Sequence, residues 1–288
     1  MMFTNIDSVE YVAIAFFIAL AVSFIAYKLR MLALSGMIAA AIVGGIIFAF
    51  GGIIASVLLL TFFLSGSLLS KLNKNSPLLS KEGGRGVVEP GDGDNRPLTP
   101  ALKRRGDVRN WKQVLCNGAI PAIAVIIIAL RHDLREEISL LFLGALATAT
   151  ADTWATEIGT RFGKGVYNIF TFRLSVKGIS GGVSLIGLGA SILGALLIAV
   201  LSLIRFSVYD PICELIFVKV IPVITISGFC GALLDSIIGA TLQAKYKLPD
   251  GSIAEVKSEG AVLHSGISFI GNNATNLIAT LWGGVIAI

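Results

Sequence analysis

Residues 31–70 read MLALSGMIAAAIVGGIIFAFGGIIASVLLLTFFLSGSLLS, and this stretch decides the class of fold. It contains no charged side chain from end to end. One helix needs only about 20 apolar residues to cross a bilayer, so the stretch is long enough for two spans. Gly51 and Gly52 lie at its centre and predict a tight turn between the two spans.

Similar apolar runs recur along nearly the whole chain. They are continuous rather than alternating, which favours helices over a membrane barrel. Hydrophobic residues make up 55% of the sequence and charged residues 14%, against about 25% charged in soluble domains. We therefore expect an all-α polytopic membrane protein with about eight transmembrane helices in one membrane domain, residues 1–288. The eight spans are expected near residues 9–27, 31–50, 53–70, 113–130, 138–158, 181–204, 216–243 and 266–287.

Basic residues are distributed unequally between the two sides of this arrangement. Nineteen of the 23 lysines and arginines fall on one side, which we call the basic side. The positive-inside rule assigns the basic side to the cytoplasm and both termini to the outside. The segments on the basic side are residues 28–30, 71–112, 159–180 and 244–264.

Other features narrow the class further. Asp7 and Glu10 precede the first apolar run, where a signal peptide would carry basic residues, so we expect a multi-pass protein of the cytoplasmic (inner) membrane type. The net charge of +5 is scattered over short loops, which excludes a nucleic-acid partner.

Residues 71–108 combine glycine, proline and charge without periodicity, which predicts a flexible cytoplasmic loop. Its acidic run is not a calcium loop, because Lys103 stands where a glutamate ligand is needed.

Polar side chains inside a span cost free energy, so those near the basic side are candidate functional residues. The first cluster enters the fourth span. Gln113 and Asn117 are four residues apart and share a helix face, and Arg109 lies one turn nearer the cytoplasm. The alternative interpretation is interfacial anchoring with an interhelical hydrogen bond.

The second cluster closes the fifth span. Asp152 shares a helix face with the threonines four residues before and after it. Arg161 and Lys164 follow on a glycine-rich exit. Carboxylate and hydroxyl oxygens suit Mg²⁺, and the cations suit a phosphate chain. The alternative is an ion pair between Glu157 and Arg161 with small-residue packing, which leaves Asp152 unexplained.

The third and fourth clusters lie in the last two spans. Asp235 approaches the basic side from within the bilayer, as Asp152 does, and Gln243 follows it. Asn272, Asn273 and Asn276 place three amides at the start of the eighth span. The alternative for both clusters is hydrogen bonding between neighbouring helices.

All four clusters lie at similar depth. Asp152 and Asp235 would repel each other strongly in a medium of low dielectric constant. A divalent cation between them would remove this repulsion and create an electrophilic site for phosphoryl transfer. The segment Ser180–Ser184 opens the sixth span, where free amides at a helix start bind phosphate well; the alternative is an ordinary glycine-rich helix start.

These blocks together resemble the transmembrane protein 19-like integral membrane family, which includes phytyl-phosphate kinase of plants and cyanobacteria. The resemblance extends over the chain except for the 75–105 region. The stretch from Asp152 to Gly163-Lys164 is also similar to an element of CTP-dependent lipid kinases. The segment Gly178-Ile179-Ser180 departs from the family pattern. The matching stretches are Arg109…Gln113-Val114…Asn117-Gly118, Ala151–Gly159, Gly181–Ser184, Asp235-Ser236…Gly239-Ala240-Thr241…Gln243 and Asn272-Asn273…Asn276.

The resemblance implies a Mg²⁺-dependent phosphotransferase in the lipid bilayer. It would convert a prenyl (phytyl-like) monophosphate into the diphosphate with CTP or another nucleoside triphosphate. Asp152 and Asp235 are then the expected metal ligands and catalytic residues, with Glu157 assisting. The expected substrate-binding residues are Arg109, Gln113, Asn117, Arg161, Lys164, Ser184, Gln243, Asn272, Asn273 and Asn276.

Two other classes fit the sequence. A secondary transporter also places polar residues at helix breaks, but its site lies near the membrane midplane and opens to both sides. A kinase site would open only to the cytoplasm and the lipid. A non-catalytic lipid-binding protein is the third class, and it gives the two buried aspartates no use.

Overall fold

The computed structural model describes residues 9–74, 108–175, 177–203, 213–249, 251 and 253–288. Over these residues the chain forms seven α-helices and one short 3₁₀ helix. Most of the predicted loop at 71–108 lies outside the described residues. The helices are α1 (Val9–Lys28), α2 (Leu34–Lys74), α4 (Trp111–Leu130), α5 (Arg135–Phe162), α6 (Leu185–Ser202), α8 (Cys213–Thr241) and α9 (Asn272–Ile286), and the 3₁₀ helix is η1 (His132–Leu134).

The predicted class of helical membrane protein is confirmed. Among the described residues, six helices are long and apolar enough to cross a membrane, namely α1, α2, α4, α5, α6 and α8. The seventh, α9, has 15 residues and occupies the position of the eighth predicted span. The number of spans and the outside location of the termini stay predictions.

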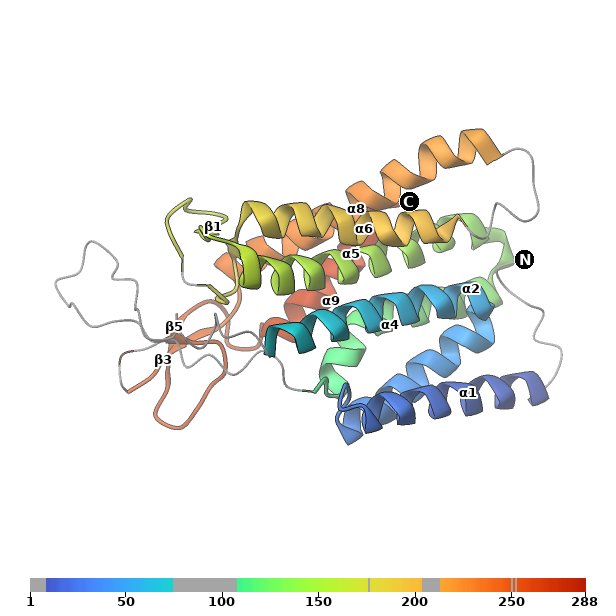
Figure 1. Cartoon of the computed structure of the whole chain (residues 1–288), viewed down its shortest axis with the longest axis horizontal. Coiled ribbons are helices and arrows are strands. Elements are labelled where there is room, and N and C mark those ends of the chain that lie inside the picture. The colour runs from blue at the N-terminus through green and yellow to red at the C-terminus, as the bar shows by residue number, and fades with distance from the viewer. Residues whose placement is uncertain (1–8, 75–107, 176, 204–212, 250, 252) are drawn as a thin grey trace.

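Helix α2 contains the two spans predicted between residues 31 and 70. Its helical path is interrupted at Gly52, which has φ 72° and ψ −169°. This left-handed conformation is available to glycine and strained for other residues. Figure 1 shows that the chain reverses direction within α2, so that its two halves run in opposite directions along the bundle. The turn therefore lies at the glycine pair that the sequence indicated.

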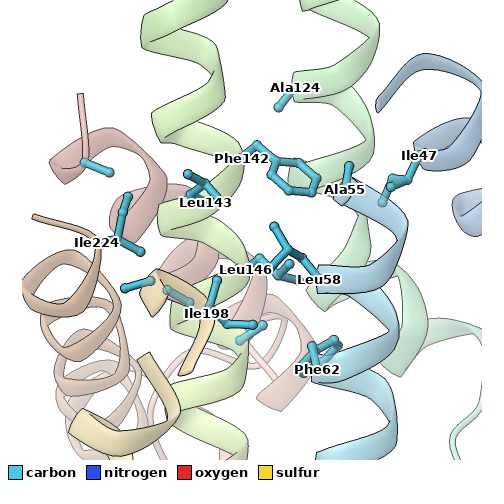
Figure 2. Close-up of a cluster of buried hydrophobic side chains, with 14 of the residues drawn as sticks. Ile47, Ala55, Leu58, Phe62, Ala124, Phe142, Leu143, Leu146, Ile198 and Ile224 are labelled. Carbon is cyan, nitrogen blue, oxygen red and sulfur yellow. The ribbon is translucent and has the colours of Figure 1, made fainter. Parts of the chain in front are cut away.

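Helix α5 forms the centre of the bundle and contacts α2, α4, α6, α8 and α9. Its side chains Phe142 and Leu146 are fully buried against Leu58 of α2, as Figure 2 shows. Ile198 of α6 and Ile224 of α8 are equally buried and lie beside α5 in the same cluster. A helix that is covered on all sides in this way holds its polar residues in fixed positions.

Glycines let α8 and α9 approach α5 closely around Thr148. A Cβ atom added at Gly231 of α8 would lie 2.3 Å from Thr148 Oγ1, and one added at Gly283 of α9 would also collide with that hydroxyl. At Gly228 an added Cβ would lie 2.8 Å from the Cβ of Ala147. Small residues of this kind permit tight helix crossings in membranes, where hydrophobic driving force between helices is weak.

Short strands gather at one end of the bundle, which we call the strand end (Figure 1). Strand β1 (Tyr167–Asn168) pairs antiparallel with β2 (Gly182–Val183). Strand β3 (Lys245–Lys247) pairs antiparallel with both β4 (Ile253–Ala254) and β5 (Val262–Ser265). Helices α1, α5 and α8 finish at the strand end, and α4, α6 and α9 begin there (Figure 1). The described parts of the segments predicted for the basic side are thus together at one end.

Two predicted span boundaries were wrong by several residues. The sixth span was expected from residue 181, but Gly182 and Val183 form β2 and α6 begins at Leu185. The eighth was expected from residue 266, but α9 begins at Asn272. Residues 182 and 183 are extended because β2 pairs with β1. Residues 266–271 form a bend and a turn that is tied to the segment after α8, where Ala244 N donates a hydrogen bond to the carbonyl oxygen of Ile270.

Because α8 approaches α5 closely at Gly231 and Thr148, we expect Gly231→Val to destabilise the helix bundle. The new side chain must push α8 away from α5, and overpacking of this kind costs about 1–3 kcal/mol. The midpoint of thermal unfolding in detergent should fall by several degrees, at roughly 2–4 °C per kcal/mol for a chain of this size.

Gly189→Ala is the matched control, because a Cβ added there meets nothing within 4 Å. Its midpoint should equal that of the wild type or exceed it slightly. If both variants and the wild type had the same midpoint of thermal unfolding, α8 would not pack closely on α5 at Thr148.

Candidate functional site

A polar cleft of about 600 Å³ opens at the strand end between α5, α6 and α8. Helix α5 contributes Asp152, and helix α8 contributes Asp235. The third wall is a glycine-rich backbone segment, Gly178–Ser184, which we call the glycine loop. The remaining lining residues are Ala155, Thr156, Gly159 and Thr160 of α5, Val166 between α5 and β1, Gly187 and Leu188 of α6, and Ser236 of α8.

The four-residue spacing on α5 explains why Asp152 faces the cleft. Thr148 packs at the crossing with α8 and α9, and Thr156, eight residues later, lines the cleft. Residues four apart share a helix face, so Asp152 lies between these two positions on the same face. Both aspartates are partly buried.

Asn276 connects Asp235 to α9. With its amide nitrogen directed toward the carboxylate, Asn276 donates to Asp235 Oδ1 at 3.1 Å and to the carbonyl oxygen of Asn272 at 2.7 Å. A hydrogen bond to a carboxylate stabilises its ionised form and fixes its orientation. The third and fourth clusters of the sequence therefore meet at one carboxylate.

Cys116 of α4 lies where the four clusters converge. Its side chain is buried and lies within electrostatic range of Asp152, Asp235 and Arg109. Its Sγ is 3.9 Å from Asn273 Oδ1, to which it donates a weak hydrogen bond. Helices α4, α5, α8 and α9 thus surround one point at the same depth.

The glycine loop is held in place through Ser180. The backbone N–H of Ser180 donates to Glu255 Oε1 at 2.6 Å, and its carbonyl oxygen accepts from Lys245 Nζ at 3.4 Å. Its hydroxyl oxygen accepts from Gln243 Nε2 at 3.0 Å. Burial lowers the pKa of Lys245, and the nearby Glu255 carboxylate opposes this effect. Three side chains from the end of α8 and from the β3–β4 hairpin therefore fix one serine.

The loop continues into α6 through two further constraints. Gly181 has φ +88°, and a Cβ there would collide with Ala240 of α8. Ser184 is the N-cap of α6, and its Oγ accepts a hydrogen bond from Gly187 N at 3.1 Å. An N-cap of this kind ends the extended segment and starts the helix.

At the start of α4, the amide side chains form hydrogen bonds within the helix and its N-terminal cap. Asn110 and Gln113 form a capping box, and Asn117 Nδ2 donates to the carbonyl oxygen of Gln113 at 3.3 Å. The guanidinium of Arg109 lies over the rings of Phe62 and Phe63, with centroid distances of 5.3 and 5.6 Å. These contacts fix Arg109 between α2 and α4.

The remaining predicted residues lie around the end of α5. Glu157 Oε1 accepts a hydrogen bond from Ser70 of α2 at 2.6 Å. The Arg161 guanidinium lies 5.2 Å from the centre of the Phe162 ring, and Lys164 is exposed just after the helix.

Not all predicted residues reach the polar cleft. Asp152, Asp235 and Ser184 line it, and Asn276 contacts Asp235. Gln243 is buried behind the glycine loop, where its Oε1 also accepts a hydrogen bond from Thr275 at 3.5 Å. The other predicted residues do not line the cleft: Arg109, Gln113, Asn117, Glu157, Arg161, Lys164, Asn272 and Asn273.

Asp152 and Asp235 suit Mg²⁺ only in the way that proteins commonly bind this ion, with few ligands from the protein itself. Among the described residues, no group of three or more histidine, cysteine, aspartate or glutamate side chains could hold a metal. Mg²⁺ commonly binds through one or two carboxylates, with water and substrate phosphate completing its shell. Asp152 and Asp235 provide such a pair in an open cleft.

Sequence reasoning missed the residues that hold the glycine loop. Glu255 and Lys245 lie in a hairpin between the last two spans, and their partner Ser180 is far away in the chain. A charged residue in a polar loop gives no local signal of such a contact.

Comparisons with known proteins agree over almost the whole chain. The profile of a family described as "Integral membrane protein DUF92" matches residues 17–284. The chain is 30% identical to Protein PGR of Arabidopsis thaliana over 90% of its own length and 89% of the relative's. It is 27% identical to an uncharacterized membrane protein of Methanocaldococcus jannaschii, over 91% of its length and 86% of the relative's. An uncharacterized membrane protein of Synechocystis is 29% identical over 71% of the chain and 69% of that protein. No solved structure matches.

The Ser180 contacts predict that Glu255→Leu loosens the glycine loop. A hydrogen bond to a charged group contributes about 1.5–3 kcal/mol, so its loss should speed amide hydrogen exchange over residues 178–184 by about tenfold or more. Glu255→Gln keeps an acceptor oxygen and should give a smaller change.

Glu259→Leu is the control, since Glu259 is exposed in the same region. Exchange over the loop should stay at the wild-type rate in this variant. If Glu255→Leu left the exchange rate of the loop unchanged as well, Ser180 would not depend on this carboxylate.

Proposed function

We propose a function from the premise that this chain belongs to the integral membrane family DUF92, as the match over residues 17–284 shows. The protein is a multi-pass membrane protein, and its proposed activity is phosphoryl transfer to a prenyl monophosphate. The donor is CTP or another nucleoside triphosphate, Mg²⁺ is the cofactor, and the product is the prenyl diphosphate. The resemblance of the sequence motifs to the family that includes phytyl-phosphate kinase supports this activity.

One observation carries the proposal: Asp152 and Asp235, from two different helices, line the same cleft opposite the glycine loop. Two carboxylates in a partly buried site are costly unless a cation or a hydrogen-bond donor compensates them. Asn276 compensates Asp235 in part. A site of this kind is suited to a divalent cation that arrives with a nucleotide.

Mg²⁺ bound by Asp152 and Asp235 would neutralise charge that develops on the phosphate oxygens. In the proposed reaction, an oxygen of the prenyl phosphate forms a bond with the γ-phosphorus of the nucleotide. The bond between that phosphorus and the β–γ bridging oxygen breaks, and the nucleoside diphosphate leaves with the electron pair. The acceptor is already ionised at neutral pH, so a strong general base is not required.

The chain's own residues would contribute mainly charge and position. Arg109, Arg161 and Lys164 would neutralise the phosphate groups of the two substrates. Ser184 and the glycine loop present a fixed backbone wall to the nucleotide. Asn117 and Asn273 lie near the acceptor side, and Asn276 orients Asp235.

The position of the cleft favours an enzyme over a transporter. Its lining comes from the final turns of α5 and α8, the start of α6 and the glycine loop, all at the strand end (Figure 1). A transporter site would lie near the midplane and be reachable from both sides. A cleft that opens at one end is consistent with a nucleotide entering from one side.

The proposal is tested with purified protein, radiolabelled CTP or ATP and a set of prenyl monophosphates. Wild-type protein should form the diphosphate in the presence of Mg²⁺, and EDTA should abolish the reaction. Asp152→Asn and Asp235→Asn should each lower the rate by about 100-fold or more, because each removes a charge that holds the cation.

Asp133→Asn is the matched control. Asp133 is exposed and paired with Arg131 at 2.7 Å, at the end of the bundle opposite the cleft. Its rate should equal that of the wild type. If no prenyl diphosphate formed with any nucleotide or any prenyl phosphate, the proposed kinase activity would be refuted. The transporter alternative would then be favoured.

A further inference from the structure

A second cavity, of about 1100 Å³, lies between α1, α2 and α4. We call it the apolar groove, because its wall is made almost entirely of hydrocarbon. Its lining includes Val22 and Ala26 of α1, Ala40 and Leu59 of α2, and Val114 of α4. Nothing in the proposed reaction has yet used this cavity.

The groove is elongated along the helices. On α1 its lining extends from Ile18 to Ala26, and on the second half of α2 from Ile53 to Phe63. At 1.5 Å per residue, these stretches correspond to about 12 and 15 Å. The reversal of α2 at Gly52 brings both of its halves into the wall. A cavity that is long and apolar in this way can take up a hydrocarbon chain.

The groove carries a cation at one end. Arg109 lines it beside Phe62 and Phe63, and the polar residue Gln113 lies next to it. Over the described part of the chain, no carboxylate lies within ion-pair distance of the Arg109 guanidinium. An anionic group of a ligand would therefore complement this charge.

The charged end of the groove reaches α5, the helix that carries Asp152. A Cβ atom added at Gly66 would lie 2.5 Å from Arg109 Nη2 and 2.8 Å from Thr153 Cγ2, so the guanidinium reaches α5 at the residue after Asp152. Cys116 also lies within electrostatic range of both Arg109 and Asp152. A phosphate held by Arg109 would thus lie next to α5, one residue along the helix from Asp152.

We propose that the apolar groove binds the hydrocarbon chain of a single-chain lipid phosphate and that Arg109 binds its phosphate. This inference rests on the proposed function, for which the lipid would be the phosphoryl acceptor. The lipid enters sideways from the bilayer, since α1 packs on α2 and faces lipid with the rest of its surface. In this arrangement the chain lies along α1 and α2 and the phosphate lies at Arg109, next to α5.

The test uses the full-length protein in nanodiscs with a prenyl monophosphate that carries a photoreactive diazirine at the far end of its chain. After irradiation, mass spectrometry locates the labelled peptides. Labelling should fall on the groove-lining faces of α1, α2 and α4. Excess farnesyl phosphate should suppress it, whereas farnesol and a diacyl phospholipid should not.

Variants separate the groove from the lipid-facing surface. Ala40→Phe fills the groove and should lower labelling about tenfold, and Ser56→Phe on the opposite wall should do the same. Ile42→Phe is the matched control, because Ile42 lies on the same half of α2, is 49% exposed and does not line the groove. Arg109→Ala should lower labelling at least tenfold, and Arg109→Lys should restore part of it.

Each outcome is decisive. Labelling on lipid-exposed positions such as Phe17, unchanged in Ala40→Phe and Ser56→Phe, would overturn the proposal, as would equal competition by the diacyl phospholipid. Labelling needs no nucleotide, so it is independent of turnover. Groove labelling without diphosphate formation would support the groove and refute the kinase, whereas diphosphate formation unaffected by Ala40→Phe would support the kinase and refute the groove.

Discussion

A carboxylate inside a membrane protein is stable only with a compensating partner, and this constraint organises the structure around Asp152 and Asp235. Helix α5 can carry Asp152 at depth because other helices cover it on every side. Helix α9, although short, supplies Asn276 to the second carboxylate. The glycine contacts at Thr148 bring α8 and α9 close enough to α5 for these groups to share one cleft. The close packing and the polar site are therefore parts of the same arrangement.

The polar cleft and the apolar groove together match the two ends of an amphiphile. One cavity offers oxygen ligands and a backbone wall, and the other offers hydrocarbon with Arg109 at one end. The second half of α2 links the groove to α5: Phe62 lines the groove, and Ser70 donates a hydrogen bond to Glu157 of α5. A shift of this half-helix relative to α5 would alter the groove and this contact together.

Much of this arrangement could be predicted from local sequence patterns. Long stretches without charged residues predicted the spans, and the pair Gly51-Gly52 predicted the reversal of α2. The four-residue spacing of Thr148, Asp152 and Thr156 placed Asp152 on the helix face that lines the cleft. Contacts between distant segments could not be predicted in this way. Gln243 and Gln113 were predicted as substrate ligands, and in the structure Gln243 binds Ser180 and Gln113 caps α4. Whether an amide side chain binds a ligand or forms hydrogen bonds within the protein depends on its neighbours in the folded structure.

Extended glycine-rich segments were also misplaced by the sequence, because glycine adds neither hydrophobic periodicity nor a strong strand preference. Residues 181–184 therefore looked like the first turn of a helix, although Gly182 and Val183 form β2. Their extended form depends on pairing with β1, and the preceding Ser180 is bound by Glu255 and Lys245 from a different loop. Local patterns predict elements well here, and the loop between them is set by partners elsewhere.

The reversal at Gly52 also affects how the protein is made. The connection between the two halves of α2 contains no charged residue and no loop outside the helical run. During synthesis, therefore, no polar segment has to cross the hydrocarbon layer at this point, and the two halves can enter the bilayer together as a preformed hairpin. A residue with a bulky side chain at position 52 would favour one uninterrupted rod instead, which is too long for the membrane and would leave the following helices with inverted orientation.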